Sequence, residues 1–287
     1  MPSCVVLGAS GFVGSEIARD LGAAGTSLTS REGYVTLDAT QPGALRTVLG
    51  RLAPSVVVNC VGLADVDLAE REPELAESLN HVVLQHLVRA QDDLGFRLVQ
   101  ISTDYVFDGR TGAYVESDPP APVNEYGRSK LRGELEVAGR LDTLVVRISS
   151  PFGEGFGARK TQFFRYLSEA LRAGRSVRAL TDQRVTATYL PDLGRALVRL
   201  LDRSMTGIVH ITSPDARTRF EFAHEVARVV GADPSLVVPA TRSEMSQWTA
   251  PRPSDTSLDV GRSIDAGVQY TPVGDALRAL LAPRAVP

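Results

Sequence analysis

The sequence contains few cysteines and histidines. Two cysteines, Cys4 and Cys60, stand among 287 residues, which excludes a disulfide framework and fits a reducing cytoplasm. Both lie in apolar runs, where a cysteine is expected to be a buried strand residue. The four histidines show no metal-ligand spacing with cysteines or carboxylates. We therefore expect no metal site.

Long hydrophobic runs and an excess of one charge are also missing. No apolar run approaches the ~20 residues of a membrane span. The net charge of −3, with 23% charged residues, gives no support to a nucleic acid or a membrane surface as partner. The first ten residues lack a basic stretch ahead of their apolar run, so we do not expect a signal peptide. These features favour a cytoplasmic protein with a small-molecule partner.

Short apolar runs rich in β-branched residues alternate with amphipathic stretches in the first half of the chain. The runs are typical of strands and lie at 4–8, 26–30, 34–38, 55–61, 97–103 and 143–149. The stretches with helical periodicity lie at 12–24, 42–52, 73–94 and 124–140. Continuously apolar strands suit a parallel sheet covered on both faces. The alternation predicts a doubly wound α/β fold of the Rossmann type.

This regularity weakens after about residue 150. After a glycine-rich segment at 151–157, the elements expected are helices at 160–173, 191–203 and 219–230 and strands at 177–180 and 207–212. We expect residues 1–150 to form the Rossmann domain, with returns to it near 176–207. Residues 151–175 and 208–287 are expected to form mainly a smaller, interleaved α/β domain that binds the substrate.

The segment GASGFVG (8–14) follows the first predicted strand and opens the first predicted helix. Glycines in such a loop permit a sharp turn, let backbone N–H groups approach a pyrophosphate, and let helix and strand pack closely. The context favours a dinucleotide site over a merely tight turn. The residues expected to contact the cofactor here are Gly8, Ser10, Gly11, Phe12, Val13 and Gly14.

The end of the second predicted strand distinguishes the two nicotinamide cofactors. An acidic residue there would bind the ribose 2′-hydroxyl, whereas a basic residue tolerates the 2′-phosphate. This chain has Ser30 and Arg31, followed by Glu32. A forked guanidinium suits a phosphate, so we expect NADPH rather than NADH; the alternative is a solvated Arg31 and a Glu32 that binds a ribose. Asp38, which ends the third predicted strand, is expected near the adenine.

Tyr126 and Lys130 are four residues apart in a predicted helix and therefore share one face. A free phenol has a pKa of about 10, and a nearby ammonium favours the phenolate and brings the phenol closer to acid–base function at neutral pH. The same lysine can hydrogen-bond the ribose of the cofactor. For an isolated pair, an exposed surface tyrosine and lysine would be the better interpretation. The glycine loop and the Ser102-Thr103 pair that ends the fifth predicted strand favour a catalytic pair here.

Motifs along nearly the whole chain resemble one family. The first four are specific, and they are GASGFVG (8–14), NCVGLADVDLAEREPELAESLN (59–80), STDYVFDG (102–109) and PVNEYGRSKLRGE (122–134). Three more are supportive, and they are DQRVTATYLPDLGRAL (182–197), GIVHITSPDARTRFEFA (207–223) and RPSDTSLD (252–259). The chain resembles an extended short-chain dehydrogenase/reductase, and specifically the dTDP-4-dehydrorhamnose reductase (RmlD-like) family. The wide G-x-x-G-x-x-G spacing of its glycine loop also resembles extended and atypical members of that superfamily.

The resemblance implies roles for the matching residues. Thr103, Tyr126 and Lys130 match the catalytic Thr/Ser–Tyr–Lys set. NADPH would deliver hydride to a keto carbon, Tyr126 would protonate the oxyanion, Thr103 would orient the carbonyl, and Lys130 would hold the ribose and polarise Tyr126. The residues that would surround the reacting sugar are Ser102, Asp104 and Tyr105, and those that would line the cofactor are Cys60, Val61 and Gly62. Asn80 matches a helical asparagine, with helix packing or capping as its alternative role.

Four positions near the expected sugar site depart from the family pattern or carry two interpretations. Ser150 stands where rhamnose-forming members have a tryptophan, and the loss of that ring reshapes the pocket. Arg184 stands where a small neutral residue is common, and it pairs with a substrate anion or lies on the rim. Arg252 matches a family arginine that contacts either the diphosphate or a loop carboxylate. Trp248 nearby covers a ligand or packs in the core.

The function expected is reduction, with NADPH, of a 4-keto group on a nucleotide-activated, dTDP-type deoxysugar. Ser150 and Arg184 leave the particular sugar open. One alternative is a non-catalytic, NADP-binding regulatory subunit that resembles the β subunit of methionine adenosyltransferase. Another is a reductase of a non-sugar ketone. A homodimer is left open.

Overall fold

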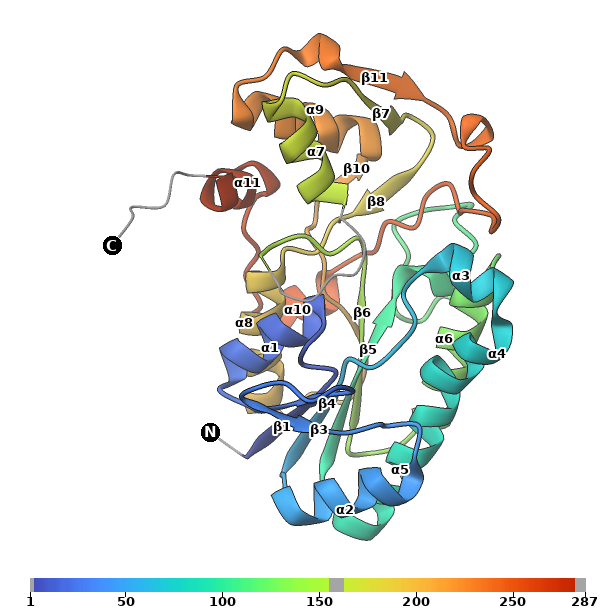
Figure 1. Cartoon of the computed structure of the whole chain (residues 1–287), viewed down its shortest axis with the longest axis vertical. Helices are drawn as coiled ribbons and strands as arrows, with labels where there is room; N and C mark the ends of the chain where they lie inside the picture. Colours follow the sequence, from blue (N-terminus) through green and yellow to red (C-terminus); the bar gives the residue numbers. More distant parts are fainter. Residues whose placement is uncertain (1–2, 155–162, 282–287) are drawn as a thin grey trace.

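The computed structural model describes residues 3–154 and 163–281, and a seven-stranded parallel sheet forms its lower half (Figure 1). The strand order is β3-β2-β1-β4-β5-β6-β9. The strands are β1 (Cys4–Leu7), β2 (Ala24–Ser27), β3 (Tyr34–Thr36), β4 (Val56–Asn59), β5 (Arg97–Thr103), β6 (Thr143–Ile148) and β9 (Gly207–His210). The order reverses between β1 and β4, as in doubly wound folds. The predicted α/β fold class is confirmed.

Helices cover both faces of this sheet, because successive side chains of each buried strand point to opposite faces. Val6 and Val58 face α1 (Phe12–Leu21) and α8 (Leu190–Asp202), whereas Val5 and Val57 face the other layer. That second layer consists of α2 (Pro42–Leu52), α5 (Val83–Leu94) and α6 (Glu125–Val137). In Figure 1 α1 and α8 lie to the left of the sheet, α5 and α6 lie to its right, and α2 lies at the bottom.

A smaller lobe lies above the carboxyl ends of the central strands (Figure 1). Its helices α7 (Phe163–Arg172), α9 (Arg219–Val230) and α11 (Val273–Leu281) share one apolar cluster. Two small sheets complete it: β7 (Val177–Leu180) pairs with β11 (Val237–Ala240), and β8 (Arg184–Thr186) pairs with β10 (Ala216–Thr218). The lobe therefore has a core of its own.

The remaining elements are short. They are α3 (Val66–Arg71), α4 (Pro73–Glu77), the π-helical turn η1 (Ser78–Val82), α10 (Gly261–Asp265), and the 3-10 turns η2 (Asp104–Val106), η3 (Pro234–Leu236) and η4 (Arg242–Glu244). Within the described ranges, no helix has both the length and the apolar character needed to cross a membrane.

Two elements lie elsewhere than the sequence predicted. β7, expected within the return to the Rossmann domain, joins the small lobe by pairing with β11. β9, expected partly in the substrate domain, is the edge strand of the central sheet beside β6. A short apolar run carries no signal for which sheet it will join. The domain limits themselves remain a prediction, and residues 155–162, which include parts of the predicted glycine segment and helix, lie outside the described residues.

Candidate active site

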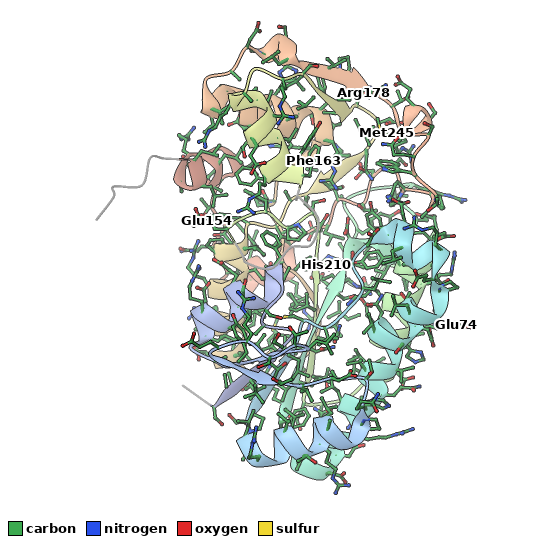
Figure 2. The ribbon with its side chains drawn as sticks, in the orientation of Figure 1. Glu74, Glu154, Phe163, Arg178, His210 and Met245 are labelled. Atoms are coloured by element: carbon green, nitrogen blue, oxygen red, sulfur yellow. The ribbon has the colours of Figure 1, made fainter. Side chains whose placement is uncertain are left out.

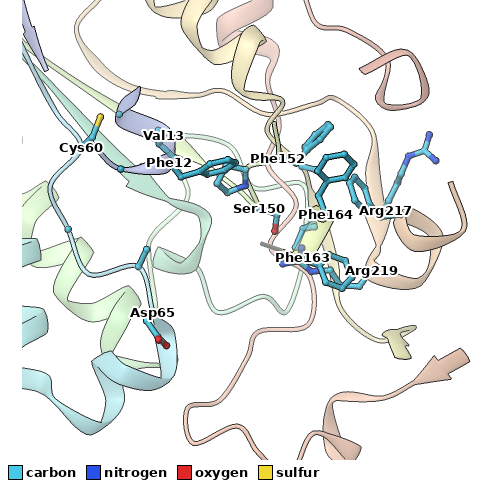
Figure 3. A pocket seen from close by; sticks show the side chains of 18 of the residues that line it. Phe12, Val13, Cys60, Asp65, Ser150, Phe152, Phe163, Phe164, Arg217 and Arg219 are labelled. Carbon is cyan, nitrogen blue, oxygen red and sulfur yellow. The ribbon is translucent and has the colours of Figure 1, made fainter. Parts of the chain in front are cut away.

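A cleft lies between the central sheet and the small lobe. It has two adjoining cavities of about 800 Å³ and about 280 Å³. The larger runs from the glycine loop to the aromatic side chains of the lobe, and the smaller contains Thr103, Tyr126 and Lys130. Figure 3 shows the lining, with Phe12 and Val13 on one side and the lobe's aromatic side chains on the other. The larger volume lies in the range of ligand pockets.

The glycine loop has the geometry of a phosphate-binding turn. Gly8 has a left-handed φ of 71°, and its carbonyl accepts a hydrogen bond from Gly11 N–H at 2.9 Å. A Cβ at Gly14 would overlap the Gly8 carbonyl, so only glycine lets α1 pack this closely on the loop. No side chain caps the N-terminus of α1, and its first turn has no acidic residue. The free N–H groups therefore fit a pyrophosphate.

The segment expected to select the cofactor lies beyond the strand rather than at its end. β2 ends at Ser27, so Ser30 and Arg31 lie in the exposed loop before β3. The Arg31 guanidinium lies 5.3 Å from the centroid of the Tyr34 ring. The predicted strand at 26–30 was placed late because Ala24 and Gly25 carry little strand propensity. Asp38 accepts hydrogen bonds from the backbone and side chain of Thr40.

The loop after β4 is tied to two helices through Asn80. The Asn80 side chain accepts from Leu63 N–H at 2.9 Å and donates to the Leu63 carbonyl and to Ser129 Oγ. It lies in the π-helical turn η1, a feature frequent at functional sites. Asn80 thus positions the backbone beside the cavity.

Three residues of the same loop line the smaller cavity, and they are Cys60, Val61 and Gly62. A Cβ at Gly62 would lie 2.7 Å from Asn80 Oδ1, so the loop approaches the helix more closely than another residue would allow. Burial raises the pKa of the Cys60 thiol to about 12, and the nearby Lys130 acts in the opposite direction. The thiol therefore stays protonated and lines the site without thiolate chemistry.

The structure brings the three predicted catalytic residues together. Thr103 ends β5, while Tyr126 and Lys130 lie on α6, whose N-terminus is capped by the Asn124 side chain. All three line the smaller cavity, where Lys130 Nζ donates to the Ile101 carbonyl at 2.7 Å. Thr103 Oγ1 donates to Asp104 Oδ1 at 3.1 Å.

Burial governs the acid–base properties of this set. It raises the pKa of Tyr126 above its ordinary value, although hydrogen bonding with Thr103 acts in the opposite direction. It lowers the pKa of Lys130 to about 8, against the attraction of Glu134. The sequence argument, in which the lysine lowers the tyrosine pKa, omitted this desolvation. A protonated phenol is the form that can donate a proton.

The neighbours predicted around the reacting sugar are held by other side chains. The buried Asp104 accepts from three hydroxyl groups, those of Thr103, Ser149 and Thr256. Ser102 Oγ donates to the buried Glu134. The Tyr105 ring packs edge-on against the Tyr126 ring at 5.7 Å between centroids.

The two departures from the family pattern, Ser150 and Arg184, and the family-matching Arg252 have different surroundings. Ser150 lines both cavities and has a left-handed φ of 41°, an unusual conformation for serine. Arg184 Nη1 lies 3.6 Å from Glu221, outside both cavities, on the rim of the cleft. Arg252 Nη2 lies 2.8 Å from Asp67, and its guanidinium covers the Trp248 ring at 4.8 Å. Its partner Asp67 belongs to the first turn of α3 rather than to a loop.

Sequence reasoning missed Arg219 and the aromatic wall beside it. Arg219 lines both cavities, and its guanidinium lies 5.2 Å from the Phe163 ring. Phe152, Phe164 and Phe222 complete this wall of the larger cavity. Phenylalanines at helical spacing are expected to be core residues, and no signal in the sequence shows that they face the cleft.

The sheet topology, the phosphate-binding turn and the Thr103–Tyr126–Lys130 set define an extended short-chain dehydrogenase/reductase. The family profile described as "RmlD substrate binding domain" matches residues 3–284. The chain belongs to the dTDP-4-dehydrorhamnose reductase (RmlD-like) family and is an oxidoreductase.

Relatives with several names share this architecture. A dTDP-4-dehydrorhamnose reductase of Mycolicibacterium smegmatis is 36% identical, over 96% of this chain and 83% of its own. A probable low-salt glycan biosynthesis reductase of Haloferax volcanii is 32% identical over 96% of each chain. Methionine adenosyltransferase 2 subunit beta of Danio rerio is 30% identical, over 97% of this chain and 90% of its own. The solved structure of dTDP-4-dehydrorhamnose reductase from Bacillus anthracis in complex with NADP superposes with a TM-score of 0.85 at 26% identity, covering 97% and 98% of the chains.

Proposed function

We propose that this protein reduces the 4-keto group of a nucleotide-activated, dTDP-type deoxysugar with NADPH. The observation that carries the proposal is the convergence of Thr103, Tyr126 and Lys130 on one cavity that adjoins the glycine loop. The names of the reductase relatives and the NADP complex of the Bacillus anthracis enzyme support the substrate class and the cofactor.

The chain's residues fit a bound NADPH, which supplies hydride to the substrate carbon. The uncapped N-terminus of α1 offers N–H groups to its pyrophosphate, and Gly14 permits their close approach. Lys130 holds the nicotinamide ribose, and Cys60, Val61 and Gly62 line the cavity. Arg31 and Ser30 take the 2′-phosphate, and Asp38 lies towards the adenine.

The proton comes from the protein. The Thr103 hydroxyl hydrogen-bonds the substrate carbonyl and orients it. Tyr126 donates its phenolic proton to the oxygen as negative charge develops there, which gives the alcohol. Burial keeps Tyr126 protonated until that moment by raising its pKa. The Lys130 ammonium then stabilises the phenolate left behind.

Substrate selection falls to the residues around this centre. Ser102, Asp104 and Tyr105 form the wall next to Thr103, and Ser150 takes the place of the family's tryptophan. The central-sheet part of the chain binds the cofactor in this proposal, and the small lobe, with α7, α9 and the sheets β7–β11 and β8–β10, binds the rest of the substrate. Arg184 and Arg252 act at the rim.

The experiment is an NADPH-oxidation assay with a panel of dTDP- and UDP-linked 4-keto sugars, and with simple ketones as the comparison. We expect turnover with at least one dTDP-linked 4-keto sugar. Turnover of simple ketones alone would contradict the sugar assignment. No turnover with any substrate, together with co-purification of a methionine adenosyltransferase, would replace the proposal with the regulatory-subunit alternative.

A further inference from the structure

Arg219, the first residue of α9, lies where the two cavities of the cleft meet. It lines the smaller cavity together with Thr103 and Tyr126, and the larger one together with Phe152 and Phe164. Figure 3 shows its side chain beside Phe163, under the aromatic wall, while the Arg217 guanidinium extends away from that wall. Among the charged residues that line these cavities, Arg219 is the one that lines both.

Arg219 has no direct carboxylate partner in the part of the chain that the structure describes. Within residues 3–154 and 163–281 it forms no ion pair, and its Nε donates to the neutral Gln183 side chain at 3.3 Å. The nearby Asp104 attracts it without a hydrogen bond or ion-pair contact, since both of its carboxylate oxygens accept from hydroxyl groups. Burial lowers the pKa of Arg219, as desolvation of an unpaired cation requires. An anionic ligand would compensate for this desolvation.

Three other arginines, of which Arg217 lines the larger cavity, differ in this respect. Arg184 lies 3.6 Å from Glu221, Arg217 lies 3.8 Å from Asp215, and Arg252 lies 2.8 Å from Asp67. Each of these guanidinium groups has a carboxylate of its own. Arg219 is therefore the one among these four that has no carboxylate within ion-pair distance among the described residues, and the one of them that lines both cavities.

We propose that Arg219 binds the diphosphate of the nucleotide-linked substrate and thereby sets the distance between the reacting sugar and the nucleoside. This rests on the proposed function. The smaller cavity, with Tyr126, takes the sugar, and the aromatic wall of the larger cavity takes the apolar face of the base. The diphosphate joins these two parts of a nucleotide sugar, and Arg219 lies at the same junction in the cleft.

The test is calorimetric titration of the full-length protein with dTDP, thymidine and inorganic pyrophosphate. Arg219→Met keeps the length and apolar contact of the side chain, and Arg219→Lys keeps the charge without the fork. Arg178→Met is the matched control, because Arg178 is an exposed arginine on the outer part of the same lobe (Figure 2). NADPH affinity, measured for each variant, reports an intact fold.

We expect Arg219→Met to weaken dTDP binding by about 30-fold, with thymidine and NADPH affinities within about 2-fold of the parent. The dTDP affinity of Arg219→Lys should lie between those of Arg219→Met and the parent, and Arg178→Met should bind dTDP as the parent does. Unchanged dTDP affinity in Arg219→Met would overturn the inference. An equal loss for thymidine or NADPH, or a parent protein that binds none of the three probes, would overturn it as well. The ketosugar assay decides the proposed function separately, since dTDP binding through Arg219 without turnover would leave this inference standing.

Discussion

Lys130 is a buried residue whose positive charge has a role in the proposed mechanism. Its ammonium donates to the Ile101 carbonyl, and burial lowers its pKa to about 8. A cofactor that prefers the charged lysine binds fully below that pKa and more weakly as pH rises through it. We expect the NADPH dissociation constant to rise between pH 7 and pH 9.5. In Lys130→Arg, which stays charged, the constant should be flat over that range; a flat profile in the parent would contradict this role.

Arg31 tests the choice of cofactor. Its guanidinium is exposed and packs on Tyr34, so its replacement leaves the core untouched. Arg31→Asp should weaken NADPH binding by about 10- to 100-fold, because a phosphate loses a charge-assisted partner and meets a carboxylate. NADH binding should change little. Equal losses for both cofactors in fluorescence titrations would contradict the contact with the 2′-phosphate.

The convergence of Thr103, Tyr126 and Lys130 on one cavity could be predicted from the sequence, whereas the place of Arg219 beside them could not. The four-residue spacing on one helix indicates Tyr126 and Lys130, and the position at the end of a strand indicates Thr103. Arg219 lies about 90 residues further along the chain, and only the tertiary fold places it in the same cavity. Arg184, for which the sequence predicted either a contact with a substrate anion or a place on the rim, carries the same charge as Arg219 but lies beside Glu221.

The turn from β1 into α1 depends on close packing between two backbones. A Cβ at position 14 would overlap the Gly8 carbonyl, which itself accepts from Gly11 N–H. Gly14→Ala should therefore lower the free energy of unfolding by about 1–3 kcal/mol and abolish NADPH binding. The matched control is Gly50→Ala in α2, where the nearest side chain is 4.0 Å away and a small gain in stability is expected. Thermal unfolding and NADPH titration check both, and wild-type behaviour of Gly14→Ala would contradict the role of this turn.

Elements with a strong pattern were predicted more accurately than short ones. The strand predicted at 97–103 matches β5, and the helix predicted at 219–230 matches α9. β8 and β10, each three residues long, were missed because so short a run has no measurable periodicity. The predicted helix at 73–94 is a continuous helical region in three parts, with a π-helical turn at Ser78–Val82. Its π-helical part follows from tertiary contacts of Asn80 rather than from local propensity.

The whole molecule is joined near its middle by a buried polar cluster around His210 (Figure 2). The His210 ring donates through Nδ1 to the Asp259 carbonyl, and its Nε2 lies 3.5 Å from Arg147. Arg147 in turn makes a bidentate ion pair with Glu134 of α6. The cluster thus links the edge strand β9, β6, α6 and the C-terminal segment.

This cluster makes stability depend on pH. Burial lowers the pKa of His210 to about 4, with Arg147 acting in the same direction, whereas an unfolded histidine has a pKa of about 6.5. Between these values the unfolded state binds more protons, so the free energy of unfolding falls as pH drops from about 6.5 to 4, by up to about 3 kcal/mol. In His210→Gln, which keeps a donor and an acceptor, the free energy of unfolding should fall less over that pH range. Denaturant unfolding at pH 7.5 and pH 4.5 measures this change in the free energy of unfolding. An equal decrease in both proteins would contradict the role of His210.

The central claim is that Tyr126 supplies the proton for reduction of a keto sugar. Its most direct test is Tyr126→Phe, which removes one hydroxyl from a buried ring and leaves the packing against Tyr105 in place. With the best dTDP-linked 4-keto sugar as substrate, kcat should fall by about 10²- to 10⁴-fold, while the NADPH dissociation constant stays within about 2-fold of the parent. A variant that retains most of its kcat would contradict the account.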